Sequence, residues 1–156
     1  MSTHLPAFLS ALRSAAEKAK VFGEITLSPR MLSCAAPASA APAEYRIELE
    51  SDGLWLSLKT PDRYLSQSIE QDLVHTGDKI HDLICDELID VGHPDPRPYP
   101  VEHFRDTAKL FTFRTRLNID LGVPPSDHTV DATFKHLLAF EAAFSHLGDM
   151  TSDGDD

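Results

Sequence analysis

The stretch EYRIELESDGLWLSLK, residues 44–59, decides the fold, because apolar and polar residues alternate on both sides of Asp52-Gly53. Alternation with a period of two is typical of a half-buried strand, and Asp-Gly is a preferred pair in a tight type I′ turn. The sequence therefore predicts an antiparallel hairpin that turns at Asp52-Gly53. The register that follows places Leu49 opposite Leu56 and Ile47 opposite Leu58.

A second pair of strands is predicted beyond the hairpin, over 101–105 and 110–121, joined by a turn at 106–109. The long strand also alternates, with apolar residues on one face and two arginines on the other. The arginines either form a docking strip for an acidic peptide or anion, or pair with glutamates across the strands. The polar face of the joined sheet is our candidate partner-binding surface, with Trp55, Arg114, Arg116, Glu48 and Glu50.

Three helical patterns accompany these strands, over 4–20, 64–91 and 128–147. The middle pattern carries an apolar stripe at steps of three and four residues, with Gly77 at its centre. Two interpretations of Gly77 stay open. Either two backbones approach closely there, or the helix breaks at Thr76-Gly77 and a new helix begins. We expect one continuous or kinked helix.

The remaining segments complete a single α+β domain over 1–148. Residues 21–27 fit a short strand, whereas 30–43 consist mainly of small residues and prolines, which favour a flexible loop. The acidic residues 149–156 are expected to form a disordered tail. The predicted fold is an antiparallel sheet of about five strands with three helices, in the order α-β-β-β-α-β-β-α.

The charge balance limits the partners that this chain can bind. Its 25 acids against 14 lysines and arginines give a net charge of −11. Nucleic acid and anionic membranes repel such a chain, whereas basic partners attract it. No apolar run reaches the roughly 20 residues that span a bilayer, and the first residues lack a signal-peptide pattern. With two unpaired cysteines, Cys34 and a buried, inert Cys85, we expect a cytoplasmic protein.

Common catalytic motifs are missing from the sequence: it has no phosphate-binding glycine loop, no Gly-x-Ser-x-Gly elbow and no His-Glu-x-x-His pair. We therefore expect no cofactor and favour a protein that is not an enzyme. One cluster offers an alternative, because His75, Asp78 and His81 follow each other at steps of three, next to Asp82. On one helix face, two imidazoles and a carboxylate could hold a metal ion. A small metal-binding protein or enzyme is therefore the second hypothesis.

The order of the elements, the small size and the acidity together resemble type III secretion chaperones and the related YbjN-like proteins. The resemblance implies a non-enzymatic homodimer that holds a partner polypeptide along its sheet and helix surfaces. In this chain the dimer contact would be the middle helix, at Gly77 with Leu73 and Ile80. The first hypothesis is therefore a protein-binding module, chaperone-like or adaptor-like, whose partner meets the polar sheet face or the acidic helix.

Overall fold

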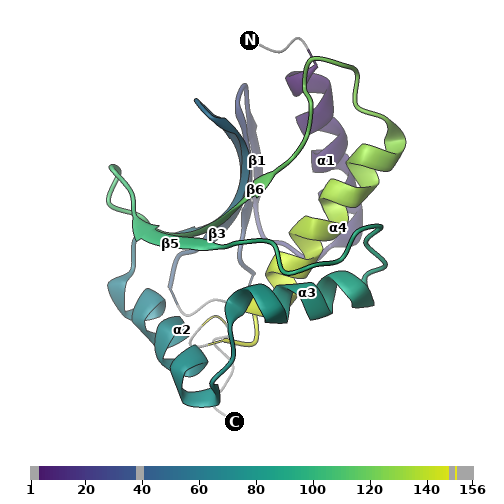
Figure 1. The fold of residues 1–156 in the computed structure, drawn as a ribbon. Coiled ribbons are helices and arrows are strands. Elements are labelled where there is room, and N and C mark those ends of the chain that lie inside the picture. Colours follow the sequence, from purple (N-terminus) through teal and green to yellow (C-terminus); the bar gives the residue numbers. More distant parts are fainter. Residues whose placement is uncertain (1–3, 38–40, 148–149, 151–156) are drawn as a thin grey trace.

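The computed structural model describes residues 4–37, 41–147 and 150, and Figure 1 shows their arrangement. Four helices are found in this part of the chain: α1 (Leu5–Ala19), α2 (Arg63–Thr76), α3 (Ile80–Asp90) and α4 (Asp127–Phe144). Six strands accompany them: β1 (Ile25–Ser28), β2 (Met31–Ala35), β3 (Glu44–Glu50), β4 (Gly53–Thr60), β5 (Glu102–Arg105) and β6 (Phe111–Leu117).

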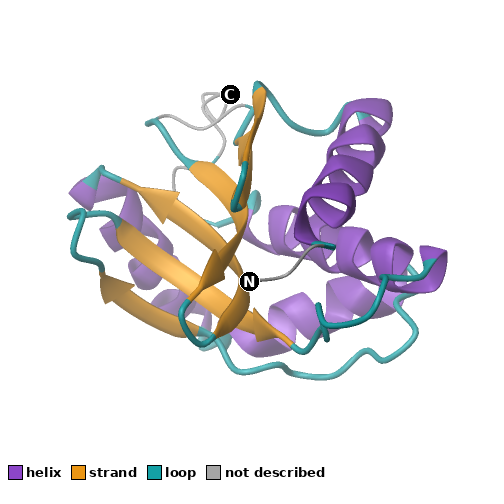
Figure 2. Ribbon diagram, turned by 90° about the horizontal axis from the view of Figure 1, so that it is seen from above, coloured by secondary structure: helices purple, strands orange, loops and turns teal. Residues whose placement is uncertain are grey.

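All six strands form one antiparallel sheet in the order β1-β2-β3-β4-β6-β5. The sheet is strongly curved, and α1, α3 and α4 lie on its outer side, while α2 lies below the β5 edge (Figures 1 and 2). The α+β class is confirmed, with one strand and one helix more than predicted. The inner side of the curve carries no helix among the described residues. We call this side the uncovered face; its central residues are Glu48, Trp55, Ser57, Lys59 and Arg114.

The segment 30–43, predicted as a flexible loop, contains strand β2, so that prediction is wrong there; residues 38–40 lie outside the described part. Strand β2 is hydrogen-bonded on both sides, to β1 and to β3, and it buries Leu32 and Cys34 in the core. The backbone N–H and C=O groups of β2 are hydrogen-bonded to strands on both sides. The strand is therefore stable although its small side chains bury little apolar area. Burial, assisted by Glu44, raises the pKa of the Cys34 thiol to about 12. Cys85, expected to be buried, is only half-buried.

The predicted hairpin is present as β3 and β4, but its register differs from the prediction by two residues. Leu49 lies opposite Leu54 and Ile47 opposite Leu56, so the two-residue turn is Ser51-Asp52 instead of Asp52-Gly53. Gly53 begins β4 with φ +138°, which other residues rarely adopt, and the Asp52 carboxylate accepts a 2.8 Å hydrogen bond from the Trp55 indole. A shift of two keeps every side chain on its predicted face.

The middle helix is broken, so the prediction of a continuous or kinked helix over 64–91 is wrong. Helix α2 ends at Thr76 and α3 begins at Ile80. Gly77 adopts φ +78° and its N–H donates to the carbonyl of Leu73, which is a left-handed helix cap. A Cβ added at Gly77 would meet no atom within 4 Å, so no backbone approaches it closely in this chain. The dimer contact at Gly77, Leu73 and Ile80 stays a prediction that now involves two helices.

The core fills the space between the sheet and the helices. Its largest fully buried side chains include Tyr45, Phe8, Phe140 and Phe144. Met150 is buried in this core as well, although the sequence predicted a disordered tail over 149–156; the other tail residues lie outside the described part. Within the described residues, no helix is both long enough and apolar enough to cross a membrane.

Candidate functional site: the uncovered face of the sheet

The uncovered face is organised in rows that run across the strands. Its central row comprises Ser33, Arg46, Ser57, Arg114 and Glu102, one from each of β2, β3, β4, β6 and β5. Because the sheet curves toward this side, neighbouring side chains crowd together, and Ser57 is only 1% exposed although no helix in the described part of the chain lies above it. Its hydroxyl is buried and has no hydrogen-bond partner among the described residues.

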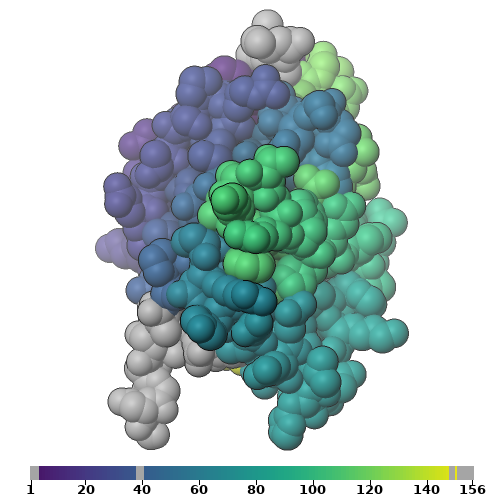
Figure 3. All heavy atoms as spheres, turned by 90° about the vertical axis from the view of Figure 1, so that its left-hand side faces the viewer, coloured from purple at the N-terminus to yellow at the C-terminus, as the bar shows by residue number. Residues whose placement is uncertain are grey.

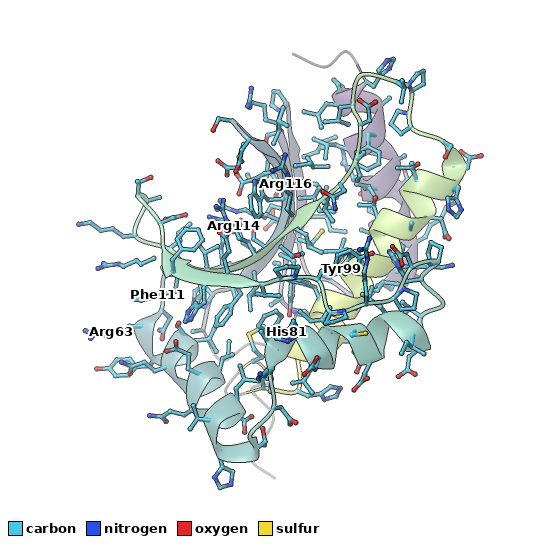
Figure 4. The ribbon with its side chains drawn as sticks, viewed as in Figure 1. Arg63, His81, Tyr99, Phe111, Arg114 and Arg116 are labelled. Carbon is cyan, nitrogen blue, oxygen red and sulfur yellow. The ribbon has the colours of Figure 1, made fainter. Side chains whose placement is uncertain are left out.

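Arg114 covers Trp55 at the centre of the uncovered face. Its guanidinium carbon lies 3.8 Å from the centroid of the Trp55 ring and 4.8 Å from that of Phe104. Its Nε also donates a 2.9 Å hydrogen bond to Glu102 on β5. Cation–π contacts and an ion pair therefore hold the arginine over the indole, which is 6% exposed. Figure 4 shows Arg114 and Arg116 along the same strand.

Lys59 is a buried cation at the other end of the face. Its Nζ donates to Asp106 Oδ2 at 2.6 Å and to Thr112 Oγ1 at 3.3 Å. Asp106 belongs to the β5–β6 turn, which lies in front of the sheet in Figure 3. Burial raises the pKa of Asp106, but the hydrogen bonds from Lys59 and from the backbone N–H groups of Leu110 and Ala108 outweigh it, so the pKa is lowered. Asp106 is therefore ionised near neutral pH and forms an ion pair with Lys59.

A hollow of about 610 Å³ opens beside Lys59. Its walls are mostly small apolar residues: Ala35, Ala36, Ala41, Pro42, Ala43, Pro61 and Leu110. Three charged side chains complete the lining: Glu44, Arg46 and Lys59. A hollow with this lining can receive an apolar side chain while charged groups contact the chain around it.

Carboxylates and cations are equal in number on the face and its adjoining turns. The strands contribute Glu44, Glu48, Glu50 and Glu102 with Arg46, Lys59, Arg114 and Arg116, and the turns contribute Asp52 and Asp106 with Arg30 and Lys109. Arg46 is bonded to Glu44 and lies 3.8 Å from Glu48. Burial raises the pKa of Glu48, although Lys59 and Arg46 oppose this effect. A raised pKa means that Glu48 would gain from a further positive neighbour.

The structure places all five predicted partner-binding residues on one face, as the alternation required. Their pairing differs from the prediction, because Arg114 bonds Glu102 on β5 instead of a glutamate on β3. Arg116 is exposed and lies beside Trp55 in the register. A molecule on this face would contact the two arginines and Glu50 before it reached the indole. Whether these residues bind a partner stays a prediction.

The three candidate metal ligands do not lie on one helix face, so the arrangement predicted for them is wrong. His75 lies in the last turn of α2, Asp78 in the break, and His81 in the first turn of α3, labelled in Figure 4. The helical spacing that would align them ends at Gly77. Throughout the part of the chain that the structure describes, no group of three or more His, Cys, Asp or Glu residues could hold a metal ion.

No pattern in the sequence predicts the contact between α2 and β5. His103 on β5 stacks on Phe113 at 3.8 Å; its Nδ1 lies 2.8 Å from Glu70 and its Nε2 lies 3.2 Å from Ser66 Oγ. Burial lowers the pKa of His103, and Glu70 opposes this effect. Serine, histidine and carboxylate follow each other as in a hydrolase triad. However, Ser66 is 2% exposed, which denies a substrate access to its hydroxyl. The three residues therefore attach α2 to the sheet.

Comparison with known proteins returned no match: no protein-family model, no curated protein and no solved structure resembles this chain closely enough to count.

Proposed function

We propose that this chain is a non-catalytic protein-binding module, chaperone-like or adaptor-like, whose uncovered face receives an extended, basic segment of a partner polypeptide. The observation that carries the proposal is a concave sheet face that no helix of the described residues covers, and on which closely spaced carboxylates and cations surround a buried tryptophan. Open sheet faces with buried aromatic and arginine side chains have the composition of interface centres.

Charge selects the partner in this proposal. The face itself is balanced in charge, but the chain as a whole carries −11, so basic segments are attracted from a distance and acidic ones are repelled. Glu48, whose pKa is raised by burial, would gain from a lysine or arginine placed above it.

The hollow beside Lys59 supplies an anchor point. Interface affinity concentrates in a few apolar or aromatic side chains that fill desolvated pockets, while surrounding contacts exclude water. A hollow of about 610 Å³ with an alanine- and proline-rich wall fits one such anchor. The expected partner segment therefore combines one large apolar residue with flanking lysines or arginines.

Site-specific photo-cross-linking in the native cell tests this proposal. A cross-linking phenylalanine analogue is placed at Glu50 or Arg116 on the uncovered face, and at Arg13 on the exposed surface of α1 as the control. The proposal predicts that both face positions capture the same polypeptide through a basic segment, and that the α1 position does not. Equal capture at all three positions, or capture of acidic segments at the face, contradicts it.

A further inference from the structure

A second cavity, of about 260 Å³, lies away from the centre of the uncovered face. It opens between the segment 93–99, the end of β6 and the amino-terminal half of α4. His128, Ala132 and His136 line it from α4 at steps of four residues, so they share one helix face. His93 and Tyr99 line the opposite wall.

His136 is the buried polar group of this cavity. It is 4% exposed, and its Nε2 has no hydrogen-bond partner among the described residues. Its ring centroid lies 5.0 Å from that of Tyr99 and 5.7 Å from that of His93. Burial, assisted by His93, lowers its pKa to about 4, so the imidazole is neutral near pH 7. A buried nitrogen without a partner is costly unless a ligand or water completes its bonding.

Two arginines line the cavity although the chain is acidic. These are Arg97 and Arg116, and Asp95 is the one carboxylate among the lining residues. Asp95 is already engaged, because its carboxylate lies 2.8 Å from Arg97, and its backbone carbonyl accepts a bond from Tyr99. The amino end of an 18-residue helix adds partial positive charge at the same place.

We propose that this cavity binds a small organic anion, a carboxylate or a phosphate ester, with its charged group toward Arg97 and the amino end of α4. The planar or apolar body of the ligand lies against Tyr99 and His136. The volume is just below the roughly 300–1,000 Å³ of cavities for drug-sized ligands, so the ligand is a small metabolite. The unpartnered His136 nitrogen provides one further hydrogen-bonding group for it.

Titration calorimetry and NMR of the histidine rings, with three probes of similar shape, test the proposal. Benzoate and phenyl phosphate carry the two kinds of anionic group, and benzamide is the neutral control. At least one anion is expected to bind and to shift the ring signals of His136, while benzamide binds at least about tenfold more weakly. Binding by benzoate alone assigns a carboxylate ligand, and binding by phenyl phosphate alone assigns a phosphate ester.

Substitutions locate the binding and separate it from the proposed protein-binding function. Arg97→Gln and His136→Phe are each expected to weaken anion binding about tenfold or more, whereas His75→Gln, at an exposed histidine of α2, leaves it unchanged. Arg97 is exposed, so its replacement leaves the fold intact. The proposal is overturned if no anion binds, if benzamide binds as tightly as the anions, or if Arg97→Gln leaves the anion affinity unchanged. Arg97 and His136 both lie outside the uncovered face, so these outcomes do not depend on a protein partner.

Discussion

At the scale of single residues, the ion pair between Lys59 and Asp106 gives the sharpest prediction. Both side chains are largely buried, so removing one charge leaves the other poorly solvated. We expect Asp106→Asn to lower the free energy of unfolding by about 2–3 kcal/mol, measured by urea denaturation. Asp78→Asn, at an exposed acid between α2 and α3, is expected to change it by less than about 0.5 kcal/mol. Equal losses in the two variants would contradict the importance of the pair.

The same pair has a defined pH dependence. The pKa of Asp106 is lower in the folded chain than its ordinary value of 3.8. The stabilisation is therefore complete above the unfolded pKa and is lost as the pH falls through the folded pKa. The difference between wild type and Asp106→Asn should be constant near neutral pH and should shrink only below about pH 4.

His136 titrates in a different window. Burial lowers its pKa from 6.5 to about 4, so above pH 6.5 both the folded and the unfolded chain hold the neutral imidazole. Between these values the unfolded chain binds more protons, and His136 removes about 3 kcal/mol of stability as the pH falls from 6.5 to 4. We expect His136→Phe to lose less stability than wild type over this range, in unfolding measured at each pH. Parallel pH profiles for the two proteins would show that the imidazole is not buried as described.

Some residue contacts could be foreseen from the sequence and others could not. Glu48, Trp55 and Arg114 were assigned to one face because alternation depends only on local geometry. The ion pair between Lys59 and Asp106 could not be foreseen, because the two residues are far apart in the sequence and approach each other only in the folded sheet. The surroundings of His136 were equally hidden, since they come from segments far apart in the sequence.

At the scale of elements, Gly53 controls the hairpin. It adopts φ +138°, and a Cβ there would lie 2.9 Å from Arg116 Nη2. We expect Gly53→Ala to destabilise the chain by about 1–3 kcal/mol in thermal or urea unfolding, because backbone strain adds to the displacement of the arginine. Gly23→Ala is the matched control, since its Cβ would make only ordinary contacts. A Gly53→Ala variant as stable as the control would contradict the turn geometry.

Attachment of α2 depends on His103. Only Leu65, Ser66 and Ile69 of α2 are buried, so the polar contacts of His103 with Ser66 and Glu70 carry much of its docking. We expect His103→Ala to speed hydrogen exchange of the α2 amides roughly tenfold without a comparable change in β4. The corresponding His75→Ala variant should leave exchange unchanged. Uniform acceleration over the whole chain would point to global destabilisation instead of a detached helix.

The elements that the sequence did not predict share a physical cause. Strand β2 forms without a strong apolar pattern because the strands on both sides hydrogen-bond its backbone. A short stretch of sequence does not reveal these pairings. Gly77 is compatible with a break, but the apolar stripe continues through it, and periodicity alone cannot separate one helix from two. The hairpin was found because its alternation and its turn residues agree.

At the scale of the whole molecule, the curved sheet separates two roles. Its outer side buries the core against α1, α3 and α4, and its inner side holds charged residues in rows. If the inner side binds a partner as proposed, charge changes at its exposed positions should alter binding with little effect on folding. This separation is what a binding surface requires, because its residues can match a partner without disturbing the core.

The net negative charge of the molecule predicts that partner binding depends on salt. If the partner segment is basic and docks on the uncovered face, its association should weaken as salt rises from low ionic strength to 0.5 M. Removing two local carboxylates with Glu48→Gln and Glu50→Gln should weaken binding of a cross-linked partner segment, prepared as a peptide, by about tenfold or more in calorimetry. Asp82→Asn with Asp86→Asn makes the same change in net charge on α3 and should have a much smaller effect. Equal weakening by both pairs would show that overall charge, and not the uncovered face, attracts the partner.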